Sequence, residues 1–326
     1  MRKTAMAVGV CVALAAGGAS AQEMGCDGLK FVFFPGGPEG GSFASVVYGG
    51  ARLAAEHTGC DVEYVWSDWN PEKMVRQFKE AIARSPDGIS IMGHPGEAAL
   101  GPLIEEARAA GIIVTTANVG LPTYEAANKA DGFGYVGQKL YESGAALGNG
   151  AVGQCDLAAG DEALVWDLLG QEGRGQRTQG VIDALEEQGL TVKYLEISDA
   201  VNSDPATGTP VFASFAVANP GLDLVVTDHG GLTATLGVYL RAAGVAPDAI
   251  CGAGFDLSAA TAQAIDEGAV DIVLDQQPFL QGYLPVVQLY LTARFGFAGM
   301  NVDTGAALIT ADNIAMVAPL AEAGIR

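Results

Sequence analysis

The stretch "DGISIMGHPGEAALGPLIEEARAAGIIVTTAN", residues 87–118, predicts one strand–helix–strand unit. Residues 88–92 and 112–116 are almost continuously apolar, while residues 100–110 carry apolar side chains at helical spacing and end at Gly111. A strand that does not alternate with polar residues is covered on both faces, which is typical of a parallel sheet flanked by helices. The unit therefore predicts an α/β fold.

The same alternation continues on both sides of this unit. Further strands are expected at residues 29–34, 61–66, 163–166, 191–197, 222–227, 249–254 and 272–274, with helices at 43–58, 71–84, 178–189 and 232–244. Right-handed crossovers between parallel strands build doubly wound sheets. Because 326 residues exceed what one compact domain usually holds, we expect two doubly wound parallel-sheet lobes.

The first 21 residues have the order of a secretory signal peptide. Arg2 and Lys3 precede an apolar run from residue 5 to about 16, and Ala19-Ser20-Ala21 supplies small residues for cleavage. The run is shorter than the roughly 20 residues that a membrane-spanning helix needs. We therefore expect a mature protein that begins near Gln22 and works outside the cytoplasm, in the periplasm.

Charge and cysteine content narrow the possible partners. The net charge of −21 becomes more negative once cleavage of the signal peptide removes Arg2 and Lys3. Nucleic acid and anionic membranes are therefore not expected partners. Four cysteines remain in the mature chain, in an oxidising compartment. Cys26 and Cys60 precede neighbouring strands and are expected to form a disulfide. A second disulfide, Cys155–Cys251, would then join the two remaining cysteines. The alternative is that all four cysteines are buried free thiols. No spacing indicates a metal site.

Polar side chains stand where the predicted strands end. In doubly wound sheets the carboxyl ends of the strands and the loops after them form the binding crevice. Asn, Gln, Asp and Arg suit the hydroxyl groups of a sugar, and an aromatic ring suits its C–H face. The candidate ligand-binding residues are Phe43, His94, Asn118, Arg177, Asp228, Asp256 and Gln276.

Each of these side chains also has a structural alternative. Phe43 fits a helix core, Arg177 fits a solvated first turn, and the polar residues at strand ends fit turns or helix caps.

Two longer stretches carry a family resemblance. "CGAGFDLSAATAQAIDEGAVDIVLDQQPFLQG" (251–282) and "RTQGVIDAL" (177–185) resemble periplasmic sugar-binding proteins of ABC importers, of the ribose- and galactose-binding type. "SFASVVYGGARLAAE" and "DGISIMGHPGEAAL" give weaker support. The resemblance runs from about Leu29 onward and implies the periplasmic binding protein-like I fold, in which a three-segment hinge joins the two lobes.

The resemblance also implies a domain division and a function. Residues 28–134 and 279–298 are expected in the N-terminal lobe, and residues 135–276 and 299–326 in the C-terminal lobe. The function it implies is capture of a neutral sugar or sugar alcohol by a monomer, for delivery to the membrane permease of an ABC importer. No cofactor and no catalysis are expected. Asp256 ends the Gly-Phe-Asp strand, Gln276 stands at a crossover, and Arg177 heads its helix, although Val181 stands where the family usually has an aromatic residue.

Other function classes fit the sequence less well. An oxidoreductase would need the G-x-G-x-x-G fingerprint, and Gly170, Gly173 and Gly175 have a different spacing. No G-x-S-x-G motif marks a nucleophile, and Asp228 with Asp256 is the only carboxylate pair for a glycosidase. A sugar-responsive repressor core is excluded by the leader and by the missing helix-turn-helix. A receptor for a furanosyl signal of the autoinducer-2 type shares the fold and stays an alternative.

Overall fold

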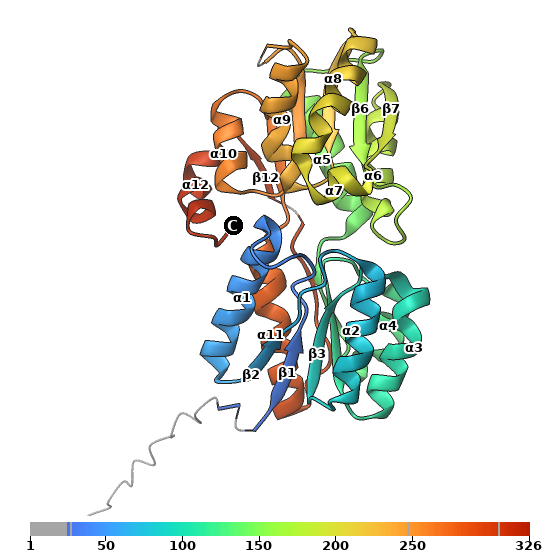
Figure 1. Cartoon of the computed structure of the whole chain (residues 1–326), viewed down its shortest axis with the longest axis vertical. Coiled ribbons are helices and arrows are strands. Elements are labelled where there is room, and N and C mark those ends of the chain that lie inside the picture. The colour runs from blue at the N-terminus through green and yellow to red at the C-terminus, as the bar shows by residue number, and fades with distance from the viewer. Residues whose placement is uncertain (1–24, 27, 247, 306) are drawn as a thin grey trace, which may run out of the picture.

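Figure 1 shows two lobes stacked end to end in a computed structural model that describes residues 25–326 except 27, 247 and 306. The expected signal peptide, residues 1–21, lies outside the described residues. Each lobe is built around one six-stranded sheet with helices on both faces. The predicted α/β class with two doubly wound lobes is confirmed.

The first sheet has the strand order β11-β5-β4-β3-β1-β2, and its strand pairs are parallel. Its strands are β1 (Lys30–Phe33), β2 (Asp61–Tyr64), β3 (Gly88–Met92), β4 (Ile113–Ala117), β5 (Gly134–Gly137) and β11 (Asn301–Asp303). The helices of this lobe are α1 (Ser42–Thr58), α2 (Pro71–Ala83), α3 (Gly96–Ala109), α4 (Pro122–Asn128), the 3-10 turn η1 (Lys129–Asp131) and α11 (Pro278–Phe295). Apolar side chains on both faces, such as Phe33 and Ile91, form its core.

The second sheet repeats this plan in the order β12-β10-β9-β8-β6-β7. Its strands are β6 (Glu162–Asp167), β7 (Thr191–Glu196), β8 (Leu222–Thr227), β9 (Cys251–Phe255), β10 (Ile272–Asp275) and β12 (Ala307–Thr310). Around it lie α5 (Leu140–Gln154), α6 (Gly175–Glu187), α7 (Asp199–Ser203), η2 (Pro205–Gly208), α8 (Thr209–Ala218), α9 (Gly230–Ala242), α10 (Ala259–Asp266) and α12 (Ile314–Glu322). Only the edge strand β12 is antiparallel among the described pairs.

Local chemistry explains where the elements begin and how they pack. Helix α2 starts at Pro71, and the Asn70 side chain accepts a hydrogen bond from the Lys73 N–H at 2.7 Å, which caps the helix. Helix α11 packs on α1 through Gly282, where a Cβ atom would lie 1.8 Å from the Val47 carbonyl oxygen. Gly144 of α5 lets α6 approach in the same way. Any larger residue at these two positions would push the helices apart.

The chain passes between the sheets three times. It leaves the first sheet after β5, returns between β10 and α11, and leaves again between β11 and β12. The expected boundaries put residues 135–137 and 301–303 in the second lobe, but β5 and β11 pair with each other in the first sheet. That assignment needs correction because "GYVG" and "NVD" are too short for their pattern to show which sheet they join.

Both expected disulfides are present. Cys26–Cys60 joins the chain ahead of β1 to the start of β2, and Cys155–Cys251 joins the end of α5 to β9. None of the helices in the described part combines the length and the apolar character that crossing a lipid bilayer would need.

Candidate functional site

The expected polar residues stand at the carboxyl ends of both sheets, where the lobes face each other. His94 follows β3 and Asn118 follows β4, while Asp228, Asp256 and Gln276 follow β8, β9 and β10. All five are buried. Asn118 and Asp256 have φ angles of 63° and 72°, a left-handed conformation that side chains other than glycine rarely adopt. Such strained residues cluster at functional sites.

A network of amide side chains joins the lobes where the chain passes from β10 to α11. The Asn118 Nδ2 donates to Gln276 Oε1 at 2.8 Å, and Gln138 Nε2 donates to the same oxygen at 3.0 Å. Gln276 Nε2 in turn donates to Asp256 Oδ1, whose other oxygen accepts from the Gly230 N–H at 3.0 Å. Gln276 therefore connects a residue of the first lobe to a carboxylate of the second.

Asp228 is held between two arginines. Arg174 Nη2 lies 2.5 Å from Asp228 Oδ2, and Arg177 Nη2 lies 2.7 Å from Oδ1. Burial alone would raise the pKa of Asp228, but Arg174 and Arg177 outweigh it and hold that pKa well below its usual range. The guanidinium of Arg177 also lies 3.8 Å above the Phe255 ring and is completely buried. The structure thus places Arg177 beneath Asp228 and not on a surface.

Arg174 is the cation that reaches the first lobe. Its Nη1 lies 3.5 Å from His94 Nε2 across the cleft. Burial and then the charge of Arg174 lower the pKa of His94 to about 3, so this imidazole is neutral at physiological pH. The same loop touches the first lobe elsewhere, because a Cβ on Gly173 would lie 2.9 Å from Val119 Cγ1.

Asp167, at the end of β6, is a second carboxyl group beside Asp228. Burial and then the charge of Asp228 raise the pKa of Asp167 well above its usual value. Its Oδ1 accepts from the Leu168 N–H and from Thr178 Oγ1, each at 2.7 Å. Asp167 Oδ2 is buried and has no hydrogen-bond partner among the described residues.

We expect Asp167→Asn to stabilise the protein more at pH 8 than at pH 5. A raised folded-state pKa contributes stability that is complete below the unfolded value of about 3.9 and is lost as the pH rises toward the folded value. Asparagine has the shape of the neutral acid and does not titrate. Urea denaturation at both pH values measures the gain, with exposed Asp312→Asn as the control. An equal gain at pH 5 and pH 8 would contradict a raised pKa.

Three rings line the first-lobe side of this region. The centroids of Phe43 and Trp69 are 5.7 Å apart, and those of Trp69 and His94 are 5.1 Å apart. Trp69 is half-buried and packs under the glycine loop before α1, where a Cβ on Gly36 would lie 2.4 Å from its ring. Phe43 and Trp69 thus form a continuous aromatic surface at this end of the first sheet.

A cavity of about 150 Å³ opens between the lobes beside these rings. Ser42, Phe43 and Val46 of α1 form one wall. The other walls come from the second lobe and the crossing: Gly230, Asp256, Leu257, Ser258, Pro278, Ala321 and Arg326. Two of the expected ligand-binding residues, Phe43 and Asp256, therefore line one cavity from opposite lobes.

Several buried polar atoms near this cleft have no hydrogen-bond partner within the described residues. They are His94 Nδ1, Arg174 Nε, Arg177 Nε and Nη1, and His229 Nε2. A buried polar group without a partner costs about 1–3 kcal/mol. Their concentration at the facing ends of two sheets indicates a site for a ligand that accepts hydrogen bonds.

Sequence reasoning missed three residues of this region: Arg174, Asp167 and Trp69. Arg174 stands three residues before Arg177 at the start of the same helix, and the strand ending at residue 166 pointed to Asp167. Trp69 lies in the loop after β2, at the same edge of the sheet as His94, and that position was the available signal.

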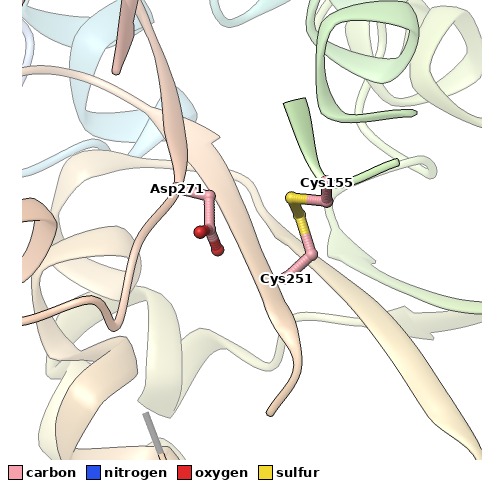
Figure 2. A group of neighbouring side chains, drawn as sticks. All are labelled: Cys155, Cys251 and Asp271. Carbon is pink, nitrogen blue, oxygen red and sulfur yellow. A yellow bond between two sulfur atoms is a disulfide. The ribbon is translucent and has the colours of Figure 1, made fainter. Parts of the chain in front are cut away.

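One group of potential metal ligands occurs in the described residues, away from the cleft. Figure 2 shows Cys155, Cys251 and the Asp271 carboxylate, whose ligand atoms lie within 4.8 Å of one another. The two sulfur atoms form a disulfide, so neither is a thiolate, and Asp271 accepts from the Gly252 N–H at 2.7 Å. This arrangement is a structural bridge and not a metal centre.

Comparison with known proteins covers most of the chain. A family model described as a periplasmic binding protein domain matches residues 31–296. The xylose/arabinose-binding protein XylF of Sulfolobus acidocaldarius is 28% identical over 268 residues, which are 78% of this chain. The match spans 65% of the length of that relative.

Two solved structures are also similar to this chain. A carbohydrate transporter from Acidothermus cellulolyticus in complex with myo-inositol superposes with a TM-score of 0.78 at 26% identity, covering 91% of this chain and 99% of that one. An ABC transporter solute-binding protein from Burkholderia graminis in complex with D-arabinose gives 0.77 at 21% identity, covering 88% and 96%. The second likeness concerns the fold alone.

Proposed function

This chain belongs to the periplasmic binding protein family, and from that premise we propose that it captures a neutral sugar or sugar alcohol between its lobes. In this proposal it works in the periplasm and delivers the ligand to the membrane permease of an ABC importer. The observation that carries the proposal is the set of buried hydrogen-bonding groups without partners, supplied by both lobes beside the Phe43 and Trp69 rings. That combination of donors and ring faces suits a polyol.

The charges near the cleft favour an uncharged ligand. Arg174 and Arg177 both pair with Asp228, the charge of Asp256 also acts on Arg177, and burial raises the pKa of Asp167. The Arg174 guanidinium is already paired with Asp228, so it is poorly placed to neutralise a phosphate or a sugar acid. We propose that such anions are rejected.

The same contacts speak against a glycosidase. Both oxygens of Asp228 are paired with arginines, and both oxygens of Asp256 accept hydrogen bonds from Gln276 and Gly230. A catalytic pair needs one carboxyl group with a proton for the leaving group and one free to attack or to activate water. Neither residue is free in this way, so we propose binding without catalysis.

A ligand screen tests the proposal. We expect D-xylose, L-arabinose, D-arabinose, D-galactose or myo-inositol to raise the melting temperature, because a ligand that binds only the folded state stabilises it by mass action. Calorimetry on the best of them should give a dissociation constant in the micromolar range or tighter, about −8 kcal/mol. Gluconate and glucose 6-phosphate serve as charged controls. A response to a furanosyl diol alone would indicate a signal receptor, and no response to any polyol would refute sugar capture.

A further inference from the structure

Residues 323–326, which follow α12, lie between the two lobes. Helix α12 packs on α10 of the second lobe, yet the Gly324 carbonyl oxygen lies 4.0 Å from the position of a Cβ on Gly49 of α1. Arg326 lines the interlobe cavity opposite Phe43. Figure 1 shows this end of the chain beside the top of α1, in the space between the lobes. A segment carried by the second lobe thus lies beside α1 of the first lobe.

An ion pair holds this segment in place. Arg326 Nη2 lies 2.8 Å from Asp275 Oδ2, and the Asp275 side chain is completely buried. Asp275 is the last residue of β10, and its Oδ1 accepts from the Gln277 N–H at 2.8 Å. Gln277 has a φ angle of 53° at the start of the crossing into α11. Arg326 is therefore fastened to the point where the chain passes from the second lobe to the first.

We propose that residues 323–326 form a strap across the cleft, and that Arg326 is a positioning residue whose pairing with Asp275 keeps the strap against α1. The strap favours the closed arrangement of the lobes and forms the wall of the cavity beside Asp256. This inference rests on the proposed function, because it describes how the same site is closed.

The geometry explains why the arginine has this role. Its ion pair lies within the second lobe and the crossing, so it survives when the lobes separate and presents the strap to α1 each time they close. Contacts made only in the closed state shift the population toward that state. Burial raises the pKa of Asp275 and the Arg326 charge opposes this, so removal of the arginine leaves a buried carboxyl group without its partner.

The experiment uses the ligand-free protein, so that it does not depend on the identity of the ligand. We expect Arg326→Ala to increase the radius of gyration in small-angle scattering and to speed amide hydrogen exchange in residues 42–50. Arg326→Lys, which keeps the charge, should restore both values in large part. The control is Glu322→Gln, an exposed charge at the end of α12. For any polyol found in the screen, we expect about 3- to 10-fold weaker binding in Arg326→Ala.

A second variant separates the strap from loss of stability. Asp275→Asn combined with Arg326→Ala removes the unpaired buried charge and keeps the acceptor for the Gln277 N–H. We expect this double variant to recover thermal stability and still show the larger radius. A radius and an exchange rate equal to those of Glu322→Gln would overturn the strap. If the radius increases but no polyol binds to the wild-type protein, then the proposed function fails and the strap stands.

Discussion

Asp228→Ala is expected to lower the free energy of unfolding by about 3–5 kcal/mol, the usual cost of removing one partner from a buried ion pair. The substitution leaves Arg177 fully buried over Phe255 without the carboxylate that forms its ion pair. Arg177 also donates to the Asp228 backbone carbonyl, and that bond does not replace the lost charge. Urea denaturation followed by circular dichroism measures the change.

Two further variants sharpen this prediction. Asp228→Asn keeps one acceptor oxygen and the side-chain volume, so its loss should be smaller than that of alanine. Asp312→Ala removes an exposed carboxylate and should change the stability by less than about 0.5 kcal/mol. Because the pKa of Asp228 is depressed, its contribution is present above the unfolded pKa of about 3.9 and is lost as the pH falls toward the folded value. Equal stability of Asp228→Ala and wild type at pH 7 would show that the cluster does not stabilise the fold.

The positions at strand ends were predictable from the sequence because parallel strands present their carboxyl ends at one edge. His94, Asn118, Asp256 and Gln276 each follow a strand that the apolar pattern reveals, and all four are buried at the carboxyl ends of the sheets. The sheet to which a very short strand belongs could not be predicted in this way. The strands β5 and β11 have four and three residues, and their place in the first sheet depends on pairing with each other across more than 160 residues of chain.

The partners of these residues could not be predicted, because they are set by tertiary contacts. Arg177 was expected at the ligand, and the structure adds an ion pair with Asp228 that no local pattern indicates. Arg174 reaches His94 only because the loop after β6 lies against the first lobe. The strap likewise depends on an ion pair between residues 275 and 326, which no local pattern indicates. Sequence periodicity locates strand ends, whereas side-chain pairing across the cleft needs the fold.

Arg174→Ala is expected to weaken binding of the captured polyol by about 10- to 100-fold. A hydrogen bond to a charged group contributes roughly 1.5–3 kcal/mol, and each 1.4 kcal/mol is a factor of ten in the dissociation constant. Arg174 has a buried Nε without a partner among the described residues, and it is the arginine that meets the first lobe. Its side chain is also more accessible than that of Arg177, at 10% against 0%. We therefore expect the affinity loss to come from lost contact with the ligand and not from unfolding.

The measurement is calorimetric titration of Arg174→Ala, Arg174→Lys and Arg241→Ala with the polyol that binds the wild-type protein. Lysine keeps the charge but not the planar fork of donors, so it should give an intermediate affinity. Arg241 is an exposed arginine on α9 and should bind like wild type. In Arg174→Ala, Asp228 keeps its ion pair with Arg177. The melting temperature of this variant should therefore fall less than that of Asp228→Ala. Wild-type affinity in Arg174→Ala would place the ligand away from the His94–Arg174 contact, on the side of the cleft formed by Phe43 and Asp256.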